Sequence, residues 1–187
     1  LVARERDPQK KAALHLRLFR LQKKLRMQDD VAAAEIRAAV ELDPKNTTIL
    51  DAAEKFFTDK KDGKGLDALY TTRLKSLDRN DVPARLLLLE RLAQLRRYEL
   101  RDLRAAIDAC EAMSALDPDA IKPREDAARL HVELGQWKEA VYAWRAVLDR
   151  DTLLVEAWRG LFSVYARSRQ ADDAFAVAAT MTALEIA

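Results

Sequence analysis

The sequence is poor in the residues from which disulfides and metal sites are built. Its 187 residues include one cysteine, Cys110, and two histidines, His15 and His131. A single thiol cannot form an intramolecular disulfide, and structural zinc sites are usually four-coordinate with Cys or His ligands. We therefore expect no metal and no cofactor, and a fold that is stabilised by packing alone.

Glycine, proline and long apolar runs are also scarce. The chain has four glycines and five prolines, and good helix formers dominate the rest. This composition predicts an all-α protein. No apolar run approaches the roughly 20 residues of a membrane-spanning helix, so we expect no membrane span. The sequence contains neither a Gly-rich phosphate loop nor a nucleophile with an adjacent base, which predicts no catalytic residue and a protein that is not an enzyme.

The charge is small overall but unevenly distributed. The formal net charge is +2, whereas residues 1–26 carry nine Lys and Arg against Glu5 and Asp7, a local balance of +7 that leaves −5 for the remainder. Such a segment is either a basic interaction surface or an ordinary solvated helix face. This segment and the arginines at 91, 96, 97, 101 and 104 also motivate an alternative hypothesis, a nucleic-acid-binding helical repeat. The small net charge and the lack of repeated outward-facing aromatics make nucleic acid the less favoured partner.

Two sets of markers recur with nearly the same period. Leu-Asp pairs begin at residues 42, 77 and 116, which gives spacings of 35 and 39 residues. Small residues stand 34 and 34 residues apart at Ala106, Ala140 and Ala174. A period of this length indicates a repeated unit of two helices.

Polar breaks, prolines and Asn-Asp or Asp-rich turns divide the chain into ten predicted helices. They cover residues 8–26, 29–42, 47–60, 64–77, 82–98, 101–116, 122–134, 137–149, 152–167 and 171–185. Paired in order, they form repeats over about 8–44, 45–80, 81–118, 119–151 and 152–187 of one domain that covers residues 1–187. A charged start without an initiator Met predicts a fragment of a longer protein.

The last two repeats carry the motifs of a known family. Trp158, Leu161 and Tyr165 supply a first helix, and Ala174 lies in the second. In the preceding repeat, residues 135–141 read Gly-Gln-Trp-Lys-Glu-Ala-Val across the turn between helices. This pattern resembles the tetratricopeptide repeat (TPR). The resemblance implies an α-solenoid, a right-handed superhelix of about five TPR-like helix pairs, that acts as a protein-protein interaction scaffold.

The resemblance also assigns packing roles to several unusual residues. The three tryptophans, Trp137, Trp144 and Trp158, occupy positions where the repeat requires large apolar groups, so packing is a better interpretation than an aromatic cage. Cys110 takes the place of a large second-helix residue and is interpreted as a small buried hydrophobe. His131 takes the place of a first-helix tyrosine and is interpreted as a packed histidine. Against the family pattern, the third repeat carries an extra residue near Arg97 to Arg101.

In tetratricopeptide proteins, peptides usually bind on the concave surface lined by the first helices. Projecting the repeat onto this chain predicts a groove that also carries Glu90, Glu125 and Glu133. The expected partner-binding residues are Lys55, Arg91, Arg97, Lys122, Arg129, Arg159 and Arg167. Since arginine binds carboxylates in bidentate fashion, an acidic protein or peptide is the expected partner. The basic amino-terminal helix is a second predicted surface, and self-association through the uncapped terminal repeats is expected as well.

Overall fold

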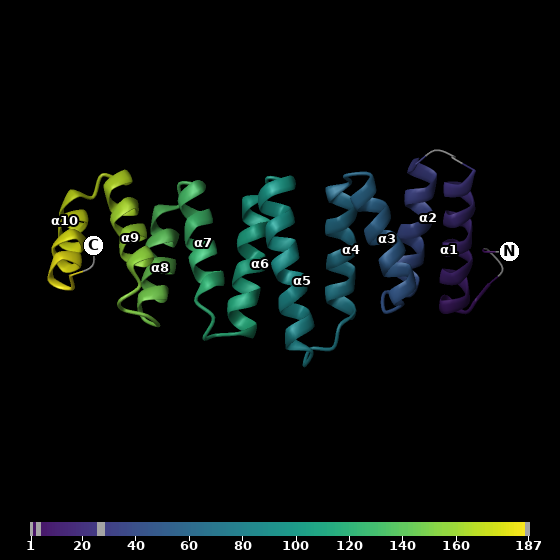
Figure 1. The fold of residues 1–187 in the computed structure, drawn as a ribbon, viewed down its shortest axis with the longest axis horizontal. Coiled ribbons are helices and arrows are strands. Elements are labelled where there is room, and N and C mark those ends of the chain that lie inside the picture. The colour runs from purple at the N-terminus through teal and green to yellow at the C-terminus, as the bar shows by residue number, and fades with distance from the viewer. Residues whose placement is uncertain (1, 3–4, 26–28, 186–187) are drawn as a thin grey trace. The chain divides into compact units, whose positions relative to one another are not determined.

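The computed structural model describes residues 2, 5–25 and 29–185, and in these residues it contains ten α-helices and no strand (Figure 1). The helices are α1 (Pro8–Lys24), α2 (Asp29–Leu42), α3 (Thr47–Asp59), α4 (Gly63–Ser76), α5 (Val82–Gln94), α6 (Leu103–Leu116), α7 (Lys122–Glu133), α8 (Trp137–Leu148), α9 (Val155–Arg167) and α10 (Ala171–Ala183). A π-helical turn, η2 (Leu95–Glu99), follows α5 directly. The predicted all-α fold with ten helices is confirmed.

The chain forms two compact units, residues 1–88 and 89–187. The first unit contains α1 to α4 and the start of α5, and the second contains the rest of the chain. Within each unit, helices that follow one another in the sequence lie side by side (Figure 1).

Four helix pairs are joined by the same left-handed turn. Its central residues are Lys61, Arg101, Gly135 and Arg169, with φ angles of 52°, 56°, 71° and 62°. A residue with positive φ after a helix lets the next backbone N–H donate to a carbonyl of the last helical turn. The amides of Asp62, Gln136 and Gln170 accordingly donate to the carbonyls of Phe57, His131 and Tyr165 at 2.9 Å each. Only one of the four turns contains the glycine that favours this conformation.

The third pair differs from the others by one residue. The amide of Asp102 donates to the carbonyl of Arg96, six residues earlier, whereas the equivalent bond in the other three pairs spans five. The π turn takes up this residue, and the Leu100 amide reaches the Leu95 carbonyl at 3.0 Å. The extra residue expected between Arg97 and Arg101 thus lies within an otherwise normal helix-turn-helix.

The predicted start of α9 at residue 152 is wrong, because the helix begins at Val155. Asp151 holds the preceding residues in a turn instead. Its side chain accepts from the Leu153 amide at 3.0 Å, and its carbonyl accepts from the Leu154 amide at 3.2 Å. An aspartate that bonds to the backbone two residues later favours a turn over a helix.

Helices α7 to α10 pack around one buried cluster. Ala140 and Ala157 are fully buried where the helices cross, and Trp144 is buried between α8 and α9. Trp137 and Trp158 are half-buried and pack against the same cluster. The interpretation of all three tryptophans as packing residues agrees with these positions.

Gly160 of α9 gives Trp144 its space. A Cβ atom at Gly160 would lie 2.3 Å from Trp144 Cε2. We expect Gly160→Ala to lower the free energy of unfolding by about 1–3 kcal/mol, because the overpacked indole outweighs a helix-propensity gain of about 1 kcal/mol. Urea unfolding of four proteins, the parent, Gly160→Ala, Trp144→Leu and the double variant, measures the coupling energy between residues 160 and 144. A Gly160→Ala change that stabilises the parent would contradict this contact.

Candidate functional site

The first helices of the second unit line an open hollow of about 380 Å³. Arg97 comes from η2, Arg129 and Glu133 from α7, and Glu156 and Arg159 from α9. The indole of Trp144, from α8, also borders it. Three of the predicted partner-binding arginines, Arg97, Arg129 and Arg159, therefore lie on one surface, which we call the first-helix hollow.

The arginines of this hollow differ in how firmly they are held. Arg97 forms a close ion pair with Glu133 of the next first helix. Arg129 lies 3.9 Å from Asp126, and Arg159 lies 3.9 Å from Glu156, each three residues away on the same exposed helix surface. Exposed pairs of this kind contribute about 0.3–0.5 kcal/mol. The Arg129 guanidinium also stacks on the Trp144 ring at 6.0 Å. The ion pairs of both arginines are weak enough to be exchanged for a pair with a ligand carboxylate.

A second hollow, of about 190 Å³, shares Arg97 with the first. Lys122 of α7 lies at its edge, with Nζ 4.0 Å from Glu90 Oε1 of α5. Tyr98 is exposed there, and the Arg97 guanidinium stacks on its ring at 5.2 Å. An exposed aromatic beside cations suits a peptide that carries both apolar and acidic side chains.

The other three predicted residues lie outside these hollows. Arg91 is exposed on α5 without lining either hollow. Arg167 ends α9 and stacks on Trp137 at 5.1 Å, which ties it to packing. Lys55 is exposed on α3 of the first unit. Of the seven predicted residues, Arg97, Lys122, Arg129 and Arg159 thus line one or both of these two hollows.

Cys110 of α6 borders the smaller hollow but is buried. Burial raises the pKa of its thiol to about 12, and Asp126 adds to this shift while Arg97 opposes it. The thiol is therefore protonated at neutral pH and is a poor nucleophile. This environment agrees with the interpretation of Cys110 as a small buried hydrophobe.

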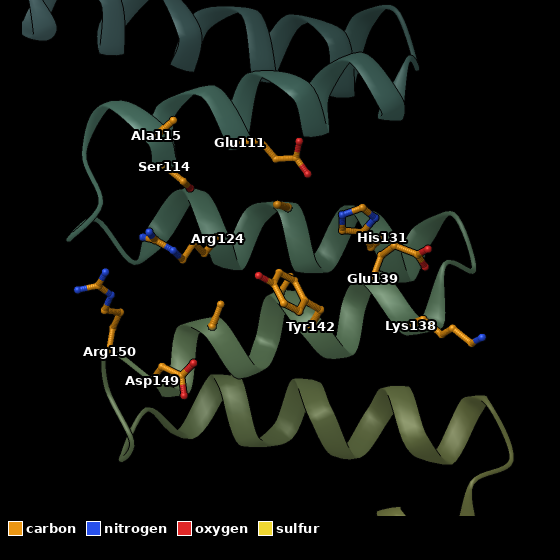
Figure 2. Close-up of a pocket in the computed structure, with 13 residues that line it drawn as sticks. Glu111, Ser114, Ala115, Arg124, His131, Lys138, Glu139, Tyr142, Asp149 and Arg150 are labelled. Carbon is orange, nitrogen blue, oxygen red and sulfur yellow. The ribbon is translucent and has the colours of Figure 1, made fainter.

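A larger hollow, of about 900 Å³, lies on the second-helix side of the same unit, between α6, α7 and α8 (Figure 2). Tyr142, which is 79% exposed, stands at its centre. Arg124 and Arg150 lie at one end, and His131 and Lys138 at the other. We call it the second-helix hollow. Sequence reasoning missed it, although the small residues at 143 and 146 beside an exposed tyrosine are a signal for it.

Three polar side chains of the second-helix hollow are bound to neighbours. Arg150 pairs with Asp119 at 3.1 Å, and Arg124 Nη1 donates to the Ala120 carbonyl at 2.6 Å. His131 Nδ1 lies 2.8 Å from Gln136 Oε1. Since acidic and basic side chains line this hollow in equal number, its charge selects no class of ligand.

In the described residues, no three His, Cys, Asp or Glu side chains gather in a way that could hold a metal ion. His15, for example, pairs with Glu35 alone at 2.6 Å. None of the described helices is both long and apolar enough to cross a bilayer.

Comparison with known proteins gives matches at the level of structure. No family model matches the sequence, and no curated protein matches it. Among solved structures, YrrB, described as a TPR protein with an unusual peptide-binding site, is 18% identical over 87% of this chain and 80% of its own, with a TM-score of 0.54. A MamA protein is 15% identical over 89% and 87%, with a TM-score of 0.52. MamA from residue 41 to its end, from Desulfovibrio magneticus RS-1, is 15% identical over 93% of both chains, with a TM-score of 0.53.

Sequence identities this low are evidence of a shared fold and not of a shared function. The ten helices, their pairing and the repeated left-handed turns agree with that comparison. The chain therefore has the tetratricopeptide-repeat fold, an all-α solenoid of helix pairs.

Proposed function

We propose that this chain is a protein-interaction scaffold that binds an acidic peptide in the first-helix hollow. The observation that carries the proposal is the convergence of Arg97, Arg129 and Arg159 from three successive first helices on one hollow. The likeness to YrrB, a TPR protein with a peptide-binding site, supports a peptide as the ligand class. The proposal assigns this hollow to binding and includes no catalytic step.

The charge of the hollow suits a ligand with a few spaced carboxylates. Three arginines face Glu133 and Glu156, which leaves an excess of one positive charge. A polyanion would be repelled by these glutamates, whereas a peptide can place its acidic residues at the arginines and its neutral residues between them. Lys122 and the exposed Tyr98 extend the same surface through the smaller hollow. This arrangement favours a peptide over a nucleic acid backbone.

Charge reversal tests this proposal. We expect Arg129→Glu with Arg159→Glu to weaken binding of fluorescent acidic peptides by about tenfold or more, because each lost charge-assisted contact is worth roughly 1 kcal/mol. Arg97 is left unchanged, since its pair with Glu133 joins η2 to α7. Fluorescence anisotropy with about ten-residue peptides that contain Glu and Tyr, against the same peptides with Gln for Glu, provides the measurement.

Lys138→Glu with Arg150→Glu is the matched control, since it changes the charge by the same amount at the second-helix hollow. Peptide binding should survive in the control. If the control loses binding and the first pair keeps it, the peptide site lies at the second-helix hollow and the proposal is wrong. Single-stranded oligonucleotides form a third arm, and tight binding with a steep loss in salt would indicate the nucleic-acid alternative instead.

A further inference from the structure

Helix α1 has two apolar faces. Ala12, Leu16 and Phe19 are buried, and α1 packs against α2. On the other side, Leu18 and Leu21 are exposed, and Leu25, the residue that caps the helix, is 62% exposed. Their spacing of three and four residues places them on one face. A face of exposed leucines indicates a surface that binds another apolar surface.

Helices α9 and α10 present a second exposed apolar face. Phe175 of α10 is 75% exposed, and Phe162 of α9 and Leu184 beyond α10 are exposed as well. In the preceding pair, the face equivalent to this one is covered by α9, which packs against α8. The chain thus shows what kind of element fits such a face, namely the first helix of another pair.

Helices α1 and α10 carry opposite charge. Helix α1 contains six Lys and Arg and no Asp or Glu, and Arg17 and Lys24 flank the exposed leucines. Helix α10 contains Asp172 and Asp173 and no Lys or Arg. Charge of one sign on each element favours contact between α1 and α10 and disfavours contact of either helix with itself.

The sizes of the residues at the two faces are complementary too. Where α9 packs on α8, the large Trp144 lies against the small Gly160. By the 34-residue repeat, Ala178 of α10 takes the place of Trp144. Ala32 and Ala174 are equivalent buried residues of their repeats. Leu18 lies 14 residues before Ala32, and Gly160 lies 14 residues before Ala174. Leu18 therefore takes the place of Gly160 in the first repeat. In a contact of α1 with α10 built like that of α9 with α8, a large residue on α1 would meet a small residue on α10, which reverses the fit of Trp144 against Gly160.

We propose that a second copy of this chain docks head to tail, with α1 of one copy on the α9–α10 face of the other. Helix α1 then lies on its partner copy as α9 lies on α8. The contact joins two different surfaces, so it is heterologous and continues from copy to copy unless it closes into a ring. Since the apolar area is small and the charges are exposed, association depends on concentration and weakens with salt. This inference does not rest on the proposed peptide site.

Single-face variants and their mixture test the proposal by sedimentation velocity from about 10 µM to about 1 mM, a range that reveals weak interfaces. The parent is expected to exceed its monomer mass of 21.2 kDa as concentration rises. Leu18→Glu places a charge in the apolar face of α1, and Phe175→Lys places one in the apolar face of α10. Each variant alone is therefore expected to stay monomeric. Leu87→Glu, at an exposed leucine of α5, is the matched control and should associate like the parent.

The equimolar mixture of the two variants distinguishes this arrangement from any symmetric dimer. Each variant keeps the face that the other lacks, so the mixture is expected to form dimers and nothing larger. Dimers in the mixture also show that both variants are folded. A parent that stays at 21.2 kDa throughout the range, a mixture that stays monomeric, or association that survives in either variant alone would overturn the proposal.

Discussion

Arginine in place of Ala140 is expected to lower the free energy of unfolding by about 4 kcal/mol or more. Ala140 is 0% exposed in the cluster that joins α7 to α10. The new side chain would overpack this crossing, which costs about 1–3 kcal/mol, and would place an unpaired charge among apolar residues, which costs several kcal/mol more. For a unit of about 100 residues, such a loss lowers the melting temperature by about 15 °C or more. Circular dichroism melting curves measure the change.

Ala166→Arg is the matched control for this prediction. Ala166 lies on α9 of the same unit and is exposed, so its substitution should shift the free energy of unfolding by less than about 0.5 kcal/mol. Equal melting temperatures for the two variants would contradict the assignment of Ala140 to the helix crossing.

The Cys110 thiol is expected to react with alkylating reagents about a thousandfold more slowly in the native protein than an ordinary thiol. Burial raises its pKa from 9.0 to about 12, a difference of three pH units. Only the thiolate reacts, and at pH 8 its fraction falls tenfold for each unit by which the pKa rises. Mass spectrometry of the alkylated chain against time measures the rate.

The pH dependence of alkylation gives an independent check. The native rate should keep rising about tenfold per pH unit between pH 9 and 11, whereas the rate of an ordinary thiol with a pKa of 9.0 levels off over the same range. Because the unfolded thiol ionises first as pH rises, the stability that the neutral buried thiol provides is present below about pH 9 and is lost toward pH 12. The same reagent on the denatured chain is the control. Native labelling at the denatured rate would mean that Cys110 is exposed.

The helices were predictable because several local signals agree. Buried alanines recur at one period, and Asp7, Asn46, Asp62 and Asp102 each accept a backbone hydrogen bond at the start of a helix. The turns were harder to predict. Three of the four left-handed turn residues are Lys or Arg, whose identity gives no indication of a positive φ. The tertiary packing of the helix pairs imposes that conformation on them.

The candidate site was predictable in part for the same reason. A repeat fixes which positions of a first helix face the groove, and this was enough to find Arg97, Arg129 and Arg159. It could not show that Arg167 is engaged by Trp137, because that contact depends on the end of α9 meeting the start of α8. The second-helix hollow depends on the spacing between α6 and α8, which periodicity does not specify.

The π turn makes chain length itself a determinant of binding specificity. Residues that follow an insertion in a helix rotate by about 100° each, so the extra residue decides whether Arg96 or Arg97 is directed to the groove. As the structure stands, Arg97 pairs with Glu133 there, while Arg96 Nη1 donates to the Ala105 carbonyl of α6. Loss of one residue before Arg96 would turn Arg97 into the direction that Arg96 has now and leave the helix-turn-helix intact. A repeat protein of this kind can thus acquire a different ligand preference through a change in length, with every side chain of the groove retained.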